Sequence, residues 1–316
     1  MKRSIAVVMD PIERINTAKD TSFALMLEAQ RRGYGLFYVE PGSLSVQHAL
    51  AHGRLATLKI NDVKNQYFEL GEWQNTALSS VDAVLMRKDP PVDDQFIHDT
   101  QILSLAESQG VLVVNRAQGL RDMNEKLTTL LFPQCCPETL VSRSMTDLKE
   151  FIRRHGDTVV KPLNGMGGKS IFRIRHGDGN ANVILETLTD SGSLTMAQKF
   201  IPEIAQGDKR ILLVDGEPVP YVLARIPQGD EFRGNLAAGG RGQGQPLSER
   251  DRWTAQQVGP WLKEQGMPLA GPDATGDYLT EVNVTSPTCV RELDAQFGLN
   301  IAGLLFDAIE ARLAKT

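Results

Sequence analysis

The chain contains few cysteines and histidines and no long apolar run. Its three cysteines, two of them adjacent, cannot form a disulfide framework, and no Cys-x-x-Cys pair is present. The five histidines are scattered without the spacing of zinc ligands, so a zinc site is not expected. No stretch of about 18 apolar residues occurs, so the sequence predicts no membrane-spanning helix. The apolar segment near the start ends at Asp10-Pro11 and is too short for a signal peptide, which favours a cytoplasmic protein.

Positive charge is also scarcer than negative charge. The formal net charge is −5 and the isoelectric point is about 5.6, whereas a nucleic-acid-binding protein normally presents a basic face. Nucleic acid is therefore not an expected partner. The composition is otherwise ordinary, with 41% hydrophobic and 23% charged residues, and 316 residues suffice for two or three domains with large cores.

The first third of the chain alternates between apolar stretches and helical patterns. Apolar stretches predict four strands, at 5–9, 36–39, 81–86 and 111–114. Helices are predicted after a capping box from Thr17 to Asp20, ending at Gly33, and at 94–109. This βαβ rhythm predicts a parallel sheet covered by helices. Residues 45–75 support no single assignment.

Beyond Asn124 the pattern predicts short strands with antiparallel pairing. The strand candidates are 158–160, 170–174, 183–185, 195–198, 210–214 and 219–226. The last two flank Asp215-Gly216, which is a hairpin turn signal. The chain ends in a predicted helix at 300–313, whose apolar side would contain Leu304, Leu305, Ala308 and Ile309. This part of the chain is expected to be α+β.

The segment 278–288 carries the clearest chemical signal. Read as a strand, it places Glu281 and Asn283 on one face, about 6.6 Å apart, while the valines beside them point into a core. Carboxylate and amide oxygens suit a hard cation such as Mg²⁺. Asp273 lies just upstream across a turn signal, so the three side chains predict a metal–phosphate site.

Residues 159–170 combine a strand, Lys161 and a glycine-rich turn. The glycines would let backbone N–H groups approach phosphates, and the lysine would supply charge. Leu163 stands where a Walker A motif needs glycine, and the third glycine of a Rossmann fingerprint is missing. The residues alone fit a phosphate cradle and a plain hairpin turn equally well. Lys126, taken alone, is most simply a solvated surface lysine.

Two further segments each allow a functional and a purely structural interpretation. The run 229–244 is rich in glycine. Arg225 precedes it, and Arg233 and Arg241 lie within it. The run suits either a lid over anionic groups or a disordered surface loop. Arg87 and Asp10 follow predicted strands, where ligands of α/β folds bind, so each is a substrate contact or part of a solvated turn.

Together these segments resemble the ATP-grasp superfamily and, within it, the bacterial glutathione synthetase family. The resemblance covers nearly the whole chain, and its motifs occur in the expected order, at 8–11, 27–33, 86–91, 120–126, 162–168, 207–210, 216–220, 224–229, 233–241 and 281–288. Each motif is modest alone, but their number and order make the match specific. One departure is Pro272 and Ala274 beside Asp273, where the family usually has branched apolar residues, and these are expected to weaken the strand.

The resemblance implies an ATP-grasp fold in three domains. Residues 1–122 would form an N-terminal parallel-sheet α/β substrate domain, and residues 123–200 a small central lid domain. Residues 201–316 would form an antiparallel α+β domain with the metal site and a mobile loop at 226–241.

The resemblance also implies a role for each motif residue. ATP would be bound by Lys126, Lys161, Gly165, Gly167, Gly168, Gln198, Lys199, Phe200, Ile201, Asp208 and Arg210, with adenine at 198–201 and ribose near Asp208. The catalytic residues would be Arg210, Arg225 and Arg233. Asp273, Glu281 and Asn283 would hold two Mg²⁺ ions, with Mn²⁺ as a substitute. Substrate would contact Asp10, Arg87, Arg225, Arg233, Asn283 and Ser286.

The implied reaction is the ATP-dependent ligation of γ-L-glutamyl-L-cysteine and glycine to glutathione through an acyl phosphate, which releases ADP and phosphate. It needs charge neutralisation rather than a nucleophilic side chain, so Cys135, Cys136 and Cys289 are expected to be bystanders. A homotetramer is implied. The alternative is another ATP-grasp carboxylate–amine ligase. A non-catalytic binding or scaffold protein could lose metal ligands or lid arginines, which this chain keeps, and a dehydrogenase lacks its glycine fingerprint here.

Overall fold

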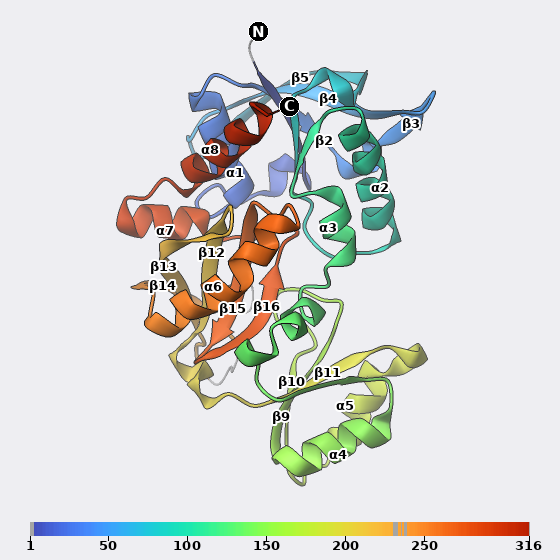
Figure 1. The fold of residues 1–316 in the computed structure, drawn as a ribbon, viewed down its shortest axis with the longest axis vertical. Coiled ribbons are helices and arrows are strands. Elements are labelled where there is room, and N and C mark those ends of the chain that lie inside the picture. Colours follow the sequence, from blue (N-terminus) through green and yellow to red (C-terminus); the bar gives the residue numbers. More distant parts are fainter. Residues whose placement is uncertain (1–2, 230–232, 235, 237–238, 316) are drawn as a thin grey trace.

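The computed structural model describes residues 3–229, 233, 234, 236 and 239–315, and three β-sheets lie within these residues. Figure 1 shows them stacked along the long axis of the molecule. The sheet of the N-terminal third lies at one end, the sheet of the central segment at the other, and the C-terminal sheet between them. The predicted domain boundaries, at 122 and 200, stay a prediction.

The first sheet is mixed rather than purely parallel. Its parallel part consists of β1 (Ser4–Val8), β2 (Gly35–Val39), β6 (Ala83–Met86) and β7 (Leu112–Val114). Its antiparallel part consists of β3 (Ser45–Gln47), β4 (Leu50–Ile60) and β5 (Phe68–Ala77), which take up the segment that the pattern left open. The strand order is β3-β4-β2-β1-β6-β7, with β5 pairing β4.

Three helices accompany this sheet: α1 (Thr21–Arg31), α2 (Asp94–Ser108) and α3 (Ala117–Asp122). The predicted capping box from Thr17 is wrong. Asp20 itself is the N-cap of α1, since its carboxylate accepts a hydrogen bond from Phe23 N–H at 2.6 Å. A capping residue therefore stands three positions later than the pattern suggested.

The second sheet is small and antiparallel. It contains β8 (Thr139–Ser142), β9 (Asp157–Pro162), β10 (Phe172–Arg175) and β11 (Thr195–Lys199) in the order β10-β9-β11-β8, with α4 (Met145–His155) and α5 (Ala181–Leu188). The predicted strand at 183–185 is wrong because these residues lie in α5. Leu185 and Leu188 pack inward while Val183 is 62% exposed, and so short an apolar run cannot distinguish a helix from a strand.

The third sheet is antiparallel and has five strands. They are β12 (Asp208–Val214), β13 (Glu217–Ile226), β14 (Arg241–Pro246), β15 (Leu269–Thr275) and β16 (Tyr278–Asn283), in the order β14-β13-β12-β15-β16. The hairpin at Asp215-Gly216 is confirmed, and both residues have positive φ, 51° and 86°. Pro272 and Ala274 do not prevent β15 from forming. All of the residues of this strand are buried.

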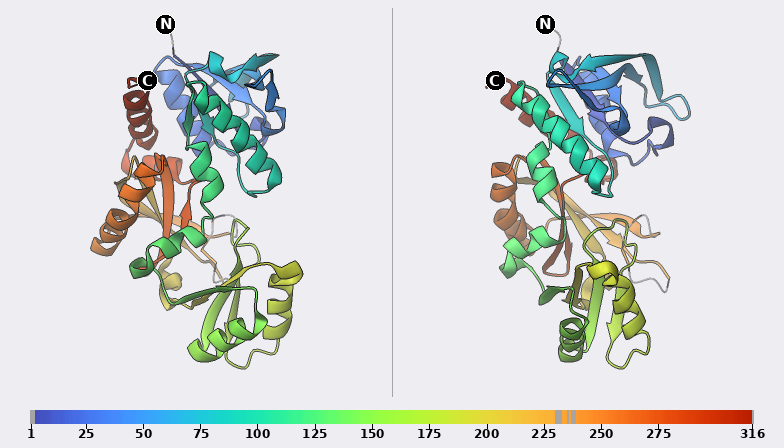
Figure 2. Two further views of the ribbon diagram at one scale, coloured as in Figure 1. Left: turned by 45° about the vertical axis from the view of Figure 1, so that its right-hand side comes forward. Right: turned by 90° about the vertical axis from the view of Figure 1, so that its right-hand side faces the viewer.

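The third sheet is accompanied by α6 (Glu249–Glu264), α7 (Val290–Phe297) and α8 (Ile301–Leu313). Helix α8 returns to the N-terminal part and lies beside α1 (Figures 1 and 2). Leu305 and Ile309 of α8 are buried as predicted, but Leu304 is 49% exposed, so its assignment to the apolar side is wrong. No helix in the described ranges is long and apolar enough to cross a membrane.

The N- and C-terminal parts share hydrophobic cores, whereas the central part has its own. Each of the two large clusters of buried side chains includes residues of the first and third sheets. The small cluster contains only residues of the central segment, from α4, α5, β9, β10 and β11. The central part is therefore a separate small body against a larger one, and the cavities described next lie where the two meet.

Candidate active site

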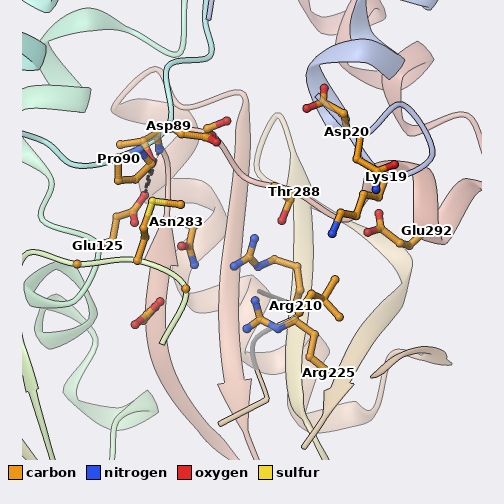
Figure 3. Close-up of a pocket in the computed structure, with 18 residues that line it drawn as sticks. Lys19, Asp20, Asp89, Pro90, Glu125, Arg210, Arg225, Asn283, Thr288 and Glu292 are labelled. Carbon is orange, nitrogen blue, oxygen red and sulfur yellow. Dashed lines mark hydrogen bonds between the residues drawn. The ribbon is translucent and has the colours of Figure 1, made fainter. Parts of the chain in front are cut away.

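Two cavities meet at Glu281 on β16. The first, called here the hinge cavity, is lined by Val159, Lys161, Ile171, Gln198, Lys199, Phe200, Ile201, Ile204, Asp208, Arg233, Gly234, Thr275, Thr280 and Glu281. The second, called the central cavity, has a volume of about 330 Å³ and is shown in Figure 3. It is lined by Asn16, Lys19, Asp20, Asp89, Pro90, Glu125, Gly165, Met166, Gly167, Arg210, Arg225, Leu236, Glu281, Asn283, Thr285, Ser286, Thr288 and Glu292.

The hinge cavity contains the whole segment that the resemblance assigned to adenine. The segment runs from the end of β11 into the connection to β12, so it joins the central body to the larger one. Backbone N–H groups of Lys199 and Phe200 already donate to the carbonyls of Glu138 and Asp157, each at 3.0 Å. Ile201 N–H donates to no acceptor in the part of the chain that the structure describes. Among residues 199–201 it is therefore the backbone donor that remains available to a ligand in this cavity.

Two buried lysines stand between the cavities. Lys126, which sequence alone presents as a solvated residue, is only 4% exposed, and its Nζ donates to Gly165 O at 3.0 Å. The same Nζ lies 3.5 Å from Glu281 Oε1. Lys161 is 5% exposed and its Nζ donates to Thr280 O at 3.3 Å. Burial lowers the pKa of Lys161, and the negative charge of Glu281 opposes that shift.

A buried cluster of opposite charges lies beside Glu281. Asp273 on β15 accepts hydrogen bonds from Arg210 on β12, which contributes Nε and Nη2, and it pairs with Arg225 Nη2 at 2.7 Å. Arg225 on β13 also donates to Asp208. The two guanidinium groups lie side by side at the centre of the cavity (Figure 3).

The charges in this cluster set one another's ionisation. Burial alone would raise the pKa of Asp273, but Arg210 and Arg225 outweigh it and hold that pKa below its ordinary value. Burial raises the pKa of Asp208 to about 6, although Arg225 opposes the shift. Burial would lower the pKa of Arg225, but the two aspartates raise it above its usual value. The arginines therefore stay charged in a nearly dry environment, which strengthens their field.

The three expected metal ligands lie on one face of the third sheet, but only Glu281 and Asn283 line the central cavity, whereas Asp273 lines neither cavity and is 1% exposed. Asp273 and Glu281 are direct partners in the antiparallel pairing of β15 and β16, and Asn283 lies two residues beyond Glu281 on the same face. Asn283 Nδ2 donates to Gly271 O and Asp273 Oδ2, at 3.0 and 3.1 Å, which leaves its Oδ1 as an acceptor.

Carboxylate and amide oxygens are the donors that Mg²⁺ prefers, so this set fits a hard cation. Both carboxylate oxygens of Asp273 pair with Arg210 and Arg225. Within the described ranges, no cluster of three or more His, Cys, Asp and Glu side chains is arranged to hold a metal, and the set expected here contains two carboxylates and one amide.

Glu125 fixes the end of the strand that carries these ligands. It is a half-buried residue next to Lys126, and its Oε1 accepts hydrogen bonds from Val284 N–H, Thr285 N–H and the Thr285 hydroxyl, at 3.0, 3.2 and 2.8 Å. Its own carbonyl accepts from Val282 N–H at 2.7 Å. The segment that carries Lys126 and the strand that carries Glu281 are therefore held in one arrangement.

The remaining predicted residues divide into two groups. Arg233 lines the hinge cavity and donates to Gly168 O at 2.9 Å, which links the long loop to the glycine turn, and Ser286 lines the central cavity. Arg87 and Asp10 line neither. Arg87 is buried behind the wall and donates to the Ser22 hydroxyl and to Pro287 O, at 3.0 and 2.9 Å. Asp10 pairs with Lys88 at 3.2 Å.

The sequence reasoning missed several residues of the central cavity. Lys19, Asp20, Glu125 and Glu292 line it, yet none was a candidate. Asp20 had a local signal, but only as a helix cap. Glu125 stands beside Lys126 in a motif from which only the lysine was predicted to bind a ligand. Glu292 lies in an ordinary amphipathic helix and is brought to the cavity only by the fold.

The chain has the ATP-grasp fold, with its charged site where the two bodies meet. Among solved structures it is similar to D-cycloserine synthetase DcsG, with a TM-score of 0.68 and 14% identity over 98% of this chain and 100% of that one. It is also similar to the ATP-grasp ligase PsnB, solved in complex with minimal precursor, Mg and ADP, with a TM-score of 0.62 and 15% identity over 98% of both chains. At such identities these likenesses show the fold alone.

The sequence comparisons identify the family. The profile of the prokaryotic glutathione synthetase ATP-grasp domain matches residues 125–298, and that of the N-terminal domain matches residues 3–121. The glutathione synthetase of Xanthomonas campestris pv. campestris is 65% identical over 316 residues, which is 100% of both chains. That of Salmonella typhimurium is 56% identical over 312 residues, 98% of this chain and 99% of the relative. The chain belongs to the prokaryotic glutathione synthetase family.

Proposed function

We propose that this chain joins γ-L-glutamyl-L-cysteine to glycine by first phosphorylating the cysteinyl carboxylate with ATP. The chain is an ATP-dependent peptide ligase of the glutathione-forming family. An ionised carboxylate is a poor electrophile, so it must be activated before an amine attacks it. Phosphorylation turns one carboxylate oxygen into part of a phosphate leaving group. The glycine amine then displaces that phosphate and forms the peptide bond, which gives glutathione, ADP and inorganic phosphate.

The observation that carries this proposal is the pair of buried arginines in the central cavity, near Glu281, where the two cavities meet. Arg210 and Arg225 line the central cavity, while Asp208 and Glu281, their neighbours in the cluster, line the hinge cavity. Nucleotide bound at the hinge would therefore present its terminal phosphate to two cations that stay charged. In phosphoryl transfer the protein acts mainly through position and charge neutralisation, which these residues supply.

Each remaining site residue has a task in this scheme. Lys126 and Lys161 would hold the ATP phosphates, with the turn that contains Gly165, Gly167 and Gly168 lying over them. Residues 198–201 would hold adenine, and Asp208 would lie near the ribose. Arg233 would close the phosphate side, because its hydrogen bond to Gly168 O already joins it to the glycine turn. Ser286, Asn283, Arg225 and Arg233 would contact the acid substrate. Arg87 and Asp10 were predicted to do so as well, but neither residue lines either of these two cavities.

We further propose that Asp273, Glu281 and Asn283 hold two Mg²⁺ ions, for which Mn²⁺ can substitute. When bound, the ions would supply positive charge against the phosphates. The predicted mobile loop at 226–241 includes residues 230–232, 235, 237 and 238, which lie outside the described residues, so the loop remains a prediction from the resemblance. The three-domain division at 122 and 200 and the homotetramer also remain predictions from the resemblance, and the cytoplasmic location remains a prediction from the sequence.

Phosphate release tests the reaction and its substrates together. The purified chain would be given ATP and Mg²⁺ with γ-glutamylcysteine, with glycine, with both and with neither. We expect rapid phosphate release only with both substrates, with glutathione in equimolar amount. Rapid release with a different acid or amine, and none with this pair, would instead favour another carboxylate–amine ligase. Nucleotide binding without turnover on any pair would indicate a binding protein.

A further inference from the structure

An arginine outside the expected site covers the aromatic ring of the hinge segment. Phe200 lines the hinge cavity, and the guanidinium of Arg173 lies over its ring, 3.4 Å from the ring centroid. Arg173 is on β10, the strand at one edge of the central sheet. Neither the sequence patterns nor the family resemblance assigned it a role, and it lines neither cavity. It therefore reaches the hinge cavity only through Phe200.

Asp157 on β9 holds Arg173 over the ring. Its carboxylate accepts two hydrogen bonds from the guanidinium, one from Nε at 2.8 Å and one from Nη2. Both side chains are half-buried. These hydrogen bonds lower the pKa of Asp157 and raise the pKa of Arg173, so both groups stay charged at neutral pH. A two-point pair of this kind fixes the plane of the guanidinium as well as its position.

The same aspartate also holds the backbone of the hinge. The carbonyl of Asp157 accepts a hydrogen bond from Phe200 N–H at 3.0 Å. Phe200 is thus held at its backbone by Asp157 and at its ring by Arg173, which Asp157 fixes in turn. The next residue is Ile201, whose N–H donates to no acceptor among the described residues. That N–H lies in the peptide plane that begins at Phe200, so fixing Phe200 at two points fixes the direction of the donor.

The chemistry of arginine suits it to this double contact. A guanidinium can pair with a carboxylate in its own plane while its flat face lies on an aromatic ring, and a lysine ammonium cannot do both. The ring attracts the cation because the face of an aromatic ring is its negative side. The pair with Asp157 leaves that face of the guanidinium available to Phe200.

We propose that Arg173 is a positioning residue for the nucleotide: it holds the ring of Phe200 and thereby orients Ile201 N–H toward the purine ring of ATP. The inference rests on the proposed function, because it takes ATP to bind with its adenine at residues 198–201. Arg173 lies outside the central cavity, where the phosphoryl group is transferred. It therefore acts on nucleotide affinity and not on the chemical step.

The variant Arg173→Met tests this role. Methionine keeps an unbranched side chain but removes the hydrogen bonds to Asp157 and the charge over the ring. We expect the Kd for ADP with Mg²⁺, measured by calorimetry, and the KM for ATP to rise about fivefold or more. The kcat at saturating ATP and the KM values for γ-glutamylcysteine and glycine should stay within about twofold of the parent. A lower kcat with an unchanged Kd for ADP would overturn the proposal.

A double variant shows whether Arg173 acts through the ring. Phe200→Leu removes the ring and should itself weaken ADP binding. The combined variant Arg173→Met/Phe200→Leu should bind ADP no more weakly than Phe200→Leu alone, because the guanidinium then has no ring to hold. Losses that multiply in the combined variant would contradict action through Phe200. Arg173→Lys keeps the charge without the flat fork, so its Kd for ADP should lie between those of the parent and Arg173→Met.

Arg153 on α4 provides the matched control. Its Nε and Nη2 donate to the two carboxylate oxygens of Glu150, at 2.8 and 2.7 Å, which is the same kind of pair. Arg153 is exposed, however, and the described residues that line the hinge cavity include none from α4. Arg153→Met should therefore keep the Kd for ADP of the parent. Equal weakening of ADP binding in Arg153→Met and Arg173→Met would contradict a specific role for Arg173.

The outcomes separate this inference from the function on which it rests. A parent protein that binds ADP but makes no glutathione would contradict the proposed function, while its ADP affinities would still test the contact. A parent that makes glutathione, with an Arg173→Met variant that binds ADP as the parent does, would contradict only this inference. Parallel losses of ADP affinity, of kcat and of affinity for γ-glutamylcysteine would indicate general damage to the central body and contradict the positioning role.

Discussion

At the scale of single residues, this site depends on charges that are buried together. Lys126, Lys161, Arg210 and Arg225 are each about 5% exposed or less, and a lone cation in such surroundings would be costly. Here the neighbouring carboxylates offset part of that cost, and bound phosphate would offset the rest. Removing one carboxylate therefore changes the balance of the whole cluster.

Glu281 is the residue whose substitution is most informative. It lies opposite Asp273, within 3.5 Å of Lys126 and on the wall of both cavities. Glu281→Gln keeps the shape of the side chain, but it removes the negative charge that faces Lys126 and the proposed Mg²⁺ ions. We expect turnover to be nearly abolished with Tm close to that of the parent, as measured by glutathione formation and thermal unfolding. Retention of more than about a tenth of the parent rate, a barrier change below about 1.4 kcal/mol, would contradict the metal assignment.

At the scale of secondary-structure elements, the contact of α1 with α8 joins the N- and C-terminal parts. Arg32 at the end of α1 donates to Gly303 O and pairs with Asp307 and Glu310 of α8, at 2.9, 2.7 and 3.1 Å. Glu28, one turn earlier, pairs with Arg32 at 2.6 Å and holds it toward α8. This buried carboxylate therefore contributes to the contact between the two parts.

The stability of that contact should depend on pH. Hydrogen bonds from Arg31 lower the pKa of Glu28 from 4.5 to about 2, with Arg32 adding to the shift and burial opposing it. Because the pKa is lower in the folded state, ionised Glu28 stabilises the fold above about pH 4.5, and this contribution is lost as the pH falls toward 2. We expect Glu28→Gln to lower Tm by about 2 °C or more at pH 7, with a smaller difference at pH 3.

A surface pair provides the control for this measurement. Glu150 and Arg153 on α4 have the same i,i+3 spacing and the same 2.7 Å distance as Glu28 and Arg31, but Glu150 is 46% exposed. Exposed pairs contribute little, so Glu150→Gln should leave Tm almost unchanged. A Glu28→Gln variant with the Tm of the parent at pH 7, or with a difference that grows on acidification, would contradict the account.

At the scale of the whole molecule, local sequence patterns predicted most of the helices and strands, but not how these elements pack against one another. The parallel strands and the face shared by Glu281 and Asn283 follow from periodicity, because each depends on neighbouring residues only. The antiparallel strands within 45–75 and the helix at 181–188 were missed or wrong, since short apolar runs fit both kinds of element. The burial of Lys126 against Gly165 and Glu281 depends on contacts between distant segments.

Two residues of the central cavity, Lys19 and Glu292, show the same limit most clearly. Lys19 and Glu292 are 273 positions apart, and nothing in the local sequence of either indicates the other. The resemblance to a known family supplied the roles of the motif residues, including the arginines and the hinge. It supplied no role for Lys19 or Glu292, which the fold brings into the same cavity.

The central claim is that the acid substrate is phosphorylated at its carboxylate before the amine attacks, and an oxygen-labelling measurement tests it directly. γ-Glutamylcysteine labelled with ¹⁸O in both oxygens of the cysteinyl carboxylate would be converted with glycine, ATP and Mg²⁺. Because one carboxylate oxygen leaves with the phosphate, each inorganic phosphate released should carry one ¹⁸O atom. Unlabelled phosphate, or label in AMP together with released pyrophosphate, would show a different activation and contradict the account.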